Sequence, residues 1–331
     1  MNYDKPFKTL DEQLNILRAR RLEIYDEDKG KHILLTASYY DLINGYKDIF
    51  MPNDQFKPGT TIEKLFVFDF MDKSVQALTM KYGLMVEVKF KAHLAYILAK
   101  NIGVHQDDYL DAKHYKRKVN RNLTFLKVKE EINKQLNVNF AKHPTKHYLK
   151  KHNHVPPWIL FKNVSLGTSI NLFKCLNSSN KSEVANLLIP SNKLETKEKI
   201  ALIMTAMEGI RRFRNFAAHN LNFVKCRTQY NIPGESLYKL LPKGVIRRYN
   251  GKIAQKDKYA LKGIFGIILS IFILVNDVMI QKCMISEFSA ILAPNSDELI
   301  FFKKEYAHAM DIPCDISERL PKLEVSPNYK L

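Results

Sequence analysis

Cysteine, glycine and proline are scarce in this sequence of 331 residues. The four cysteines, Cys175, Cys226, Cys283 and Cys314, are far apart and include no C-x-x-C pair, which fits neither a disulfide scaffold nor a thiolate zinc site. The 12 Gly and 13 Pro fall below average usage, roughly 7% and 5%. These absences argue against a turn-rich all-β chain and favour a helical protein.

A long hydrophobic run is also lacking. The longest candidate, residues 263–275, is closed by Lys262 and Asp277 and is too short to cross a bilayer core of about 30 Å. We expect it to form a buried core helix. The first residues, MNYDKPFKTLDEQ, have no apolar core of the kind a signal peptide needs. We therefore expect a cytoplasmic protein without a membrane partner.

Acidic residues are too few to balance the basic ones. The chain has 34 Asp and Glu against 52 Lys and Arg, a formal charge of +18. An excess of this size indicates an anionic partner, and nucleic acid is the first candidate. An anionic membrane is a weaker one, because the strongest basic cluster, residues 116–121, lacks the apolar half of a membrane-binding helix.

Helix signals recur along the chain. Thr9 with Glu12, and Thr60 with Glu63, have the spacing of capping boxes. We expect one helix to start at Leu10. Further helices are expected over about 33–43, 60–100 (one helix, or two broken near Gly83), 182–189, 196–220, 258–282 and 296–308. Gly45 is expected to end the second in a left-handed conformation. A soft boundary near 152 divides an N-terminal part, 1–151, from a second part, 152–310, and the tail 311–331 looks irregular.

Much of the charge excess lies in residues 113–151, which contain twelve Lys or Arg and only two acids, Glu130 and Glu131. Its densest cluster predicts phosphate contacts, with neighbouring rings for stacking on unpaired bases. The cations are Lys116, Arg117, Lys118 and Arg121, and the rings are Tyr115 and Phe125. The alternative is a solvated helix face.

The most informative segment runs from Glu208 to Asn220, EGIRRFRNFAAHN. At 100° per residue four apolar residues of this helix share one face, which is predicted to be buried: Ala206, Ile210, Phe213 and Ala217. The opposite face carries a polar stripe: Glu208, Arg212, Asn215 and His219, with Arg211 at its edge. Arg214 projects from the flank, about 140° from His219.

Arg214, Asn215 and His219 are residue types that suit metal-independent RNA cleavage. The nucleophile is the RNA's own 2′-OH. His219 supplies a base that works near neutral pH, Arg214 offsets charge on the phosphorus oxygens, and Asn215 holds the imidazole or a phosphate oxygen. Arg211 and Arg212 are candidate RNA-binding residues. The alternative is an ordinary helix end with a capping histidine and surface arginines.

This segment resembles the R-N-x-x-x-H signature of HEPN domains, many of which are RNases. The rest of the chain resembles the abortive-infection (Abi) proteins of the AbiD/AbiF group. The ordered set of similar pieces is Lys5-Pro6, Gln13-Leu14, Leu34-Leu35, YYDLINGY at 39–46, Pro157-Trp158, Ser165-Leu166-Gly167 and RNFAAHN at 214–220.

The resemblance implies an all-α HEPN-like bundle with additional N-terminal and central helices. It implies a bacterial phage-defence or toxin-type endoribonuclease, restrained by a bound structured non-coding RNA. HEPN RNases generally pair two motifs, and this chain has one, so a homodimer with a composite site is implied. The alternative is a non-catalytic RNA-binding protein that acts by occupancy or sequestration.

Other motifs carry less chemistry. His143 and His147 have a zinc-like spacing, but Pro144 lies between them and no acidic or Cys partner is near. Nucleotide-binding and serine-hydrolase motifs are absent from the sequence. We expect no metal and no cofactor.

Overall fold

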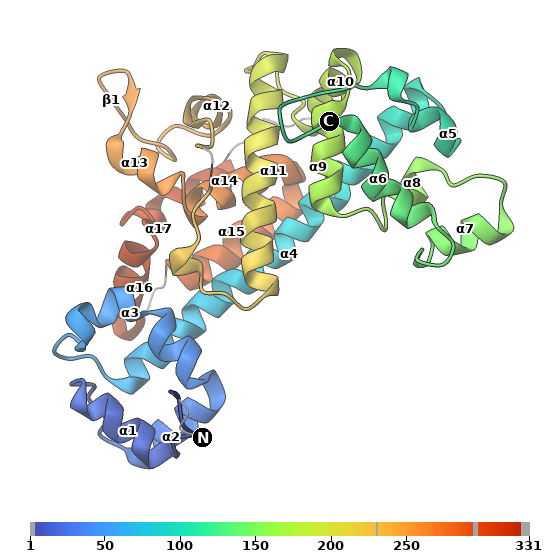
Figure 1. Ribbon diagram of the computed structural model, residues 1–331. Helices are drawn as coiled ribbons and strands as arrows, with labels where there is room; N and C mark the ends of the chain where they lie inside the picture. Colours follow the sequence, from blue (N-terminus) through green and yellow to red (C-terminus); the bar gives the residue numbers. More distant parts are fainter. Residues whose placement is uncertain (1–3, 230, 294–296, 326–331) are drawn as a thin grey trace.

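A computed structural model describes residues 4–229, 231–293 and 297–325 of the chain, and helices make up nearly all of its regular structure (Figure 1). The α-helices are α1 (Leu10–Ala19), α2 (Glu27–Ala37), α3 (Lys47–Phe50), α4 (Ile62–Asn101), α5 (Gln106–Tyr109), α6 (Phe125–Leu136), α7 (Thr145–Lys151), α8 (Pro157–Leu160), α9 (Leu166–Cys175), α10 (Ser178–Leu188), α11 (Thr196–Ala218), α12 (Gly234–Leu240), α13 (Gln255–Ala260), α14 (Ile264–Val275), α15 (Val278–Leu292), α16 (Asp297–Ala309) and α17 (Ile316–Arg319). Shorter helical turns are the π-helix η1 (Tyr40–Asn44) and the 3-10 turns η2 (Pro52–Asp54), η3 (Ala112–His114), η4 (Phe223–Lys225) and η5 (Pro321–Val325). The expected all-α class is confirmed.

Helix α4 is the axis of the fold. Its 40 residues span about 60 Å. In Figure 1 the elements α1–α3 lie at its N-terminal end, α5–α8 lie at the other end, and α11, α14 and α15 cross its middle. The helix continues through Gly83, where a Cβ would lie 3.4 Å from the Ile210 side chain of α11. Its N-cap is Thr61, whose hydroxyl accepts from the backbone N–H of Lys64 at 3.1 Å, rather than the expected Thr60.

The N-terminal elements agree only in part with the sequence patterns. The capping box of α1 is confirmed, with reciprocal bonds between Thr9 and Glu12 of 2.8 and 3.2 Å. The single helix expected over 33–43 is wrong, because Ser38 has φ 55° and separates α2 from η1. Gly45 has φ −61°, so the expected left-handed cap is also wrong.

The helix expected over 258–282 is wrong as well, because the chain forms α13, α14 and part of α15 there. Asn276 adopts a left-handed conformation that ends α14. Asp277 then caps α15 by accepting from the N–H of Ile280 at 2.9 Å. The tail is not wholly irregular, since it contains α17 and η5; residues 326–331 lie outside the described residues.

Helix α14 confirms the expected core helix. Every residue from Ile264 to Val275 is buried, and the helix packs against α4, α11 and α15. One cluster of buried apolar residues runs from Leu14 to Leu323 and includes residues on both sides of position 152, where the domain boundary stays a prediction. In the described ranges, no helix combines the length and apolarity needed to cross a membrane.

The described residues also contain a small β-hairpin, which the sequence patterns did not predict. Strand β1 (Arg248–Tyr249) pairs antiparallel with β2 (Lys252–Ile253), in the register Arg248 opposite Ile253. Asn250 and Gly251 both have positive φ, 48° and 73°, as a tight hairpin turn requires.

Candidate active site

Helix α11 presents the segment that carries the candidate chemistry. Three of the four residues predicted for its buried face, Ala206, Ile210 and Phe213, are buried where α11 packs against α4 and α14. The fourth, Ala217 near the end of the helix, is only half-buried. The helix ends at Ala218, two residues before the expected end. His219 is the C-cap, and Asn220 has φ 55°, a left-handed conformation that Asn tolerates better than most residues.

Asn215 and His219 are exposed at this end of α11. They are joined by the helix backbone, since the N–H of His219 donates to the carbonyl of Asn215 at 3.0 Å. Among the described residues the side chain of His219 has no hydrogen-bond or ion-pair partner. Its imidazole is therefore accessible to a ligand.

Arg214 is turned toward α4 and pairs with a buried acid. Its guanidinium lies 2.8 Å from Glu87, and the two side chains are 26% and 10% exposed. Lys91, one turn along α4, lies 2.6 Å from the other oxygen of Glu87. Arg214 lies on the flank of α11 as expected, but its guanidinium contacts the carboxylate of Glu87.

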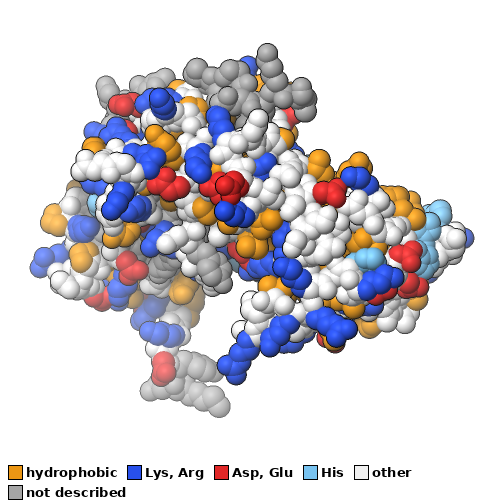
Figure 2. Space-filling view, turned by 90° about the horizontal axis from the view of Figure 1, so that it is seen from above, with side chains coloured by type: hydrophobic (Ala, Val, Ile, Leu, Met, Phe, Trp, Pro, Cys, Tyr) orange, Lys and Arg blue, Asp and Glu red, His pale blue; other side chains and the backbone are white. Residues whose placement is uncertain are grey.

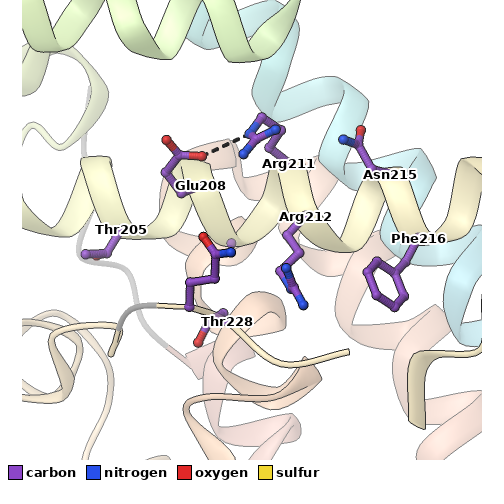
Figure 3. A pocket seen from close by; sticks show the side chains of 9 residues that line it. Thr205, Glu208, Arg211, Arg212, Asn215, Phe216 and Thr228 are labelled. Atoms are coloured by element: carbon purple, nitrogen blue, oxygen red, sulfur yellow. Dashed lines mark hydrogen bonds and ion pairs between the residues drawn. The ribbon is translucent and has the colours of Figure 1, made fainter. Parts of the chain in front are cut away.

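Arg211 and Arg212 leave α11 on different sides (Figure 3). Arg211 donates to Glu208 at 2.9 Å, and Lys174 of α9 lies 2.5 Å from the same carboxylate. Burial works to raise the pKa of Glu208, but Lys174 and Arg211 outweigh it and hold this pKa below its usual range. Arg212 lies on the side of Thr228 and Phe216.

The segment after His219 is held by α4 and η1. Lys73 donates to the carbonyl of Asn220 at 3.2 Å and to the side-chain oxygen of Asn222 at 3.4 Å. The amide of Asn222 donates to the carbonyl of Asp41 at 3.3 Å. It occupies the space above Gly45, where a Cβ would lie only 1.8 Å from its Nδ2.

A buried carboxylate, that of Asp72, holds the backbone of Phe223, the residue after Asn222. Asp72 of α4 is fully buried and accepts the backbone N–H of Phe223 at 2.9 Å. Its other donors are the Gln76 amide at 2.9 Å, the Tyr306 hydroxyl at 2.8 Å and the Tyr46 hydroxyl at 3.3 Å. Burial raises the pKa of Asp72, although these hydrogen bonds oppose the rise.

The structure thus brings together two segments of the sequence resemblance. Residues 39–46 and 214–220 are far apart in the chain, but Asp41 of the first segment accepts a hydrogen bond from the side-chain amide of Asn222, two residues beyond the second. Glu87, Asp72 and Lys73 were not predicted as site residues. The sequence offered one signal that could have found them: each is a charged residue within the apolar pattern of a long helix. A charge in such a position is expected to be buried, and a buried charge requires a partner.

The basic cluster lies on the loop before α6, not on a helix. Its cations Lys116, Arg117, Lys118 and Arg121 are all exposed, and Figure 2 shows Lys and Arg spread widely over the visible face of the molecule. The rings of Tyr115 and Phe125 are buried and stack on each other, with centroids 4.0 Å apart. The expectation that these rings bind unpaired bases is wrong, whereas RNA binding by the cations stays a prediction.

The spacing of His143 and His147 brings their rings to 6.3 Å between centroids. Across the parts of the chain that the structure describes, no three His, Cys, Asp or Glu side chains gather in a way that could hold a metal ion.

Comparison with known families gives a match to the Abi-like protein family over residues 32–224. This span covers more than half of the chain. The chain belongs to the Abi-like family. No curated protein and no solved structure matches it. The span matched by the Abi-like family contains α4, α11 and the two segments 39–46 and 214–220.

Family membership indicates a role in abortive infection, a form of defence against phage.

Proposed function

We propose that this Abi-like protein is an HEPN-type endoribonuclease of the AbiD/AbiF group. The observation that supports this most is the open end of α11, where Asn215 and His219 are exposed beside Arg214. Near-neutral histidine basicity, an amide and a planar cation are the groups that transesterification of RNA requires.

In the proposed reaction His219 takes the proton of the RNA 2′-OH, and the 2′ oxygen attacks the neighbouring phosphorus. The bond from phosphorus to the 5′ oxygen breaks, and this oxygen receives the proton back from the imidazolium that His219 has become. The products are a 2′,3′-cyclic phosphate and a 5′-OH. Arg214 offsets charge on the phosphorus oxygens, for which its guanidinium must exchange Glu87 for phosphate.

A homodimer completes the proposal, because each chain supplies one motif and HEPN-type RNases generally use two. The composite site would contain Arg214 and His219 from each copy. If RNA binds at α11 but is not cleaved, the second candidate applies: a non-catalytic RNA-binding protein that acts by occupancy. The pairing of Arg214 with Glu87 favours that candidate in one respect, since the arginine is not free.

The nuclease proposal is tested by the chemistry of the products. Cleavage is expected to continue in EDTA and to leave a 2′,3′-cyclic phosphate or 3′-phosphate with a 5′-OH, because the nucleophile belongs to the RNA. A matched RNA with 2′-deoxyribose at the cleaved position should resist. End-group analysis of labelled RNA measures both; cutting of the deoxy substrate, or strict dependence on added divalent metal, would indicate attack by water.

We further propose that a structured non-coding RNA restrains the enzyme by binding the basic cluster on the loop before α6, called the basic loop below. Replacing its four cations (Lys116, Arg117, Lys118, Arg121) by Gln should weaken RNA binding and raise toxicity. The slope of log affinity against log salt should fall by about three to four units, since each phosphate contact contributes roughly 0.7 to 0.9. Filter binding at several salt concentrations measures this slope.

The matched control removes four cations from other elements, Lys252, Lys256, Lys258 and Lys282. It changes the net charge equally and should lose much less of the slope. If both variants behave alike, the charge of the basic loop has no special role, and it only solvates the surface.

A further inference from the structure

The three arginines near the end of α11 differ in their partners. Arg211 faces Glu208 and Arg214 faces Glu87. Arg212 has no carboxylate partner among the described residues, and its Nε is buried without an acceptor. Its guanidinium instead lies 5.3 Å from the centre of the Phe216 ring.

The thiol of Cys226, another neighbour of Arg212, cannot neutralise the charge of its guanidinium. Burial raises the pKa of the Cys226 thiol to about 12, although the nearby Arg212 works against this rise. A thiol with this pKa is uncharged at neutral pH. Arg212 therefore keeps an uncompensated positive charge, which favours an anionic ligand.

A groove runs beside this guanidinium, between α11 and residues 228–229. Its far wall is fixed, because both the N–H and the hydroxyl of Thr228 donate to the carbonyl of Lys262, at 2.8 and 3.1 Å. The wall approaches α11 closely at Gly209, where a Cβ would lie 3.2 Å from Thr228 and 2.7 Å from Ile267. The position of residue 228 relative to α11 is therefore fixed by hydrogen bonds and close packing, and these define the shape of the groove.

Asn215 lines the same groove and stands one turn before His219, so the groove leads to the candidate active site. Arg212 and His219 are about 10 Å apart along the helix axis. A stacked strand advances about 3.4 Å per nucleotide. A single RNA strand can therefore contact Arg212 about three nucleotides away from the bond at His219.

We infer that this groove binds a backbone phosphate of the same RNA strand that is cleaved at His219, a few nucleotides from the scissile phosphate, with Arg212 as its cation. The inference rests on the proposed function for the identity of the strand. Glu208 and Arg211 also line the groove, but they pair with each other at 2.9 Å. Arg212 is therefore the lining cation that has no carboxylate partner among the described residues.

The test uses the full-length His219→Ala protein, so that cleavage does not interfere, and a fluorescein-labelled single-stranded RNA of twelve nucleotides. Adding Arg212→Ala is expected to weaken binding about tenfold and to lower the salt slope by about 0.7, the value for one phosphate contact on a single strand. Arg212→Lys should keep the slope but not the full affinity, since an ammonium lacks the planar fork.

Lys256→Ala, which removes an exposed cation of α13, is the control and should change neither quantity. If Arg212→Ala lowers the melting temperature, Arg212→Gln replaces it, because glutamine keeps most of the length over Phe216 without the charge. Neutral variants of Arg212 that bind RNA like the Lys256→Ala control would overturn the inference.

The two proposals can fail separately. Should wild-type protein cleave no RNA while Arg212 still sets affinity and slope, the nuclease proposal fails and the groove remains a phosphate site. Should RNA be cleaved in a His219-dependent way while Arg212 variants bind normally, only the groove assignment fails.

Discussion

Replacing His219 by alanine is expected to lower the rate of RNA cleavage by about 10²–10⁴-fold, the usual contribution of a positioned acid-base group, and to abolish toxicity. The fold should remain intact, because this side chain is exposed and has no partner among the described residues. Initial rates on end-labelled RNA, growth after induction and a melting curve measure the three effects.

His32→Ala is the matched control, since His32 is an exposed histidine on α2, and it should cleave at the wild-type rate. Arg214→Ala is expected to match His219→Ala in activity, and Arg214→Lys should rescue only part of it. Equal cleavage by wild type and His219→Ala would refute the assignment of the site to this end of α11.

Replacing Asp72 by alanine is expected to reduce the free energy of unfolding by at least about 3 kcal/mol, because several buried donors lose their acceptor at about 1–3 kcal/mol each. The donors come from α4, η4, α16 and the N-cap residue of α3, Tyr46. The midpoint and slope of urea unfolding measure the change.

Asp72→Asn is a finer version of the same test. The amide keeps the size of the side chain but turns one acceptor into a donor, which then faces the N–H of Phe223 or the hydroxyl of Tyr306. We expect a smaller loss of stability than for alanine and a loss of order at residues 220–223. An unchanged urea midpoint for both variants would contradict the view that Asp72 organises this region.

Composition and local patterns were sufficient to predict the all-α class, the buried face of α11 and the buried helix α14. In α11 a local repeat decides which face is covered. In α14 an unbroken apolar run is buried on every side, and in neither case is knowledge of the partner needed. Asn276-Asp277 also indicated a break between two helices, because Asn tolerates the left-handed conformation that ends a helix and Asp is a preferred N-cap. The break was not predicted, because the apolar pattern continues on both sides of it across 258–282.

The partner of each candidate site residue could not be predicted in the same way. Glu87 precedes Arg214 by more than one hundred positions, and only the crossing of α4 and α11 brings them together. Tyr115 and Phe125 look available for base stacking in the sequence, yet they bury each other. Such outcomes depend on packing between distant segments.

The carboxylate of Asp72 has a consequence for the order of synthesis. Its partners Phe223 and Tyr306 follow it by 151 and 234 positions. At about 5–20 residues per second, translation delivers Tyr306 on the order of ten seconds after Phe223. A growing chain therefore contains the complete R-N-x-x-x-H segment before the Tyr306 hydroxyl that helps to fix the following residues exists. The region around His219 reaches its final arrangement only after Tyr306 has been synthesised.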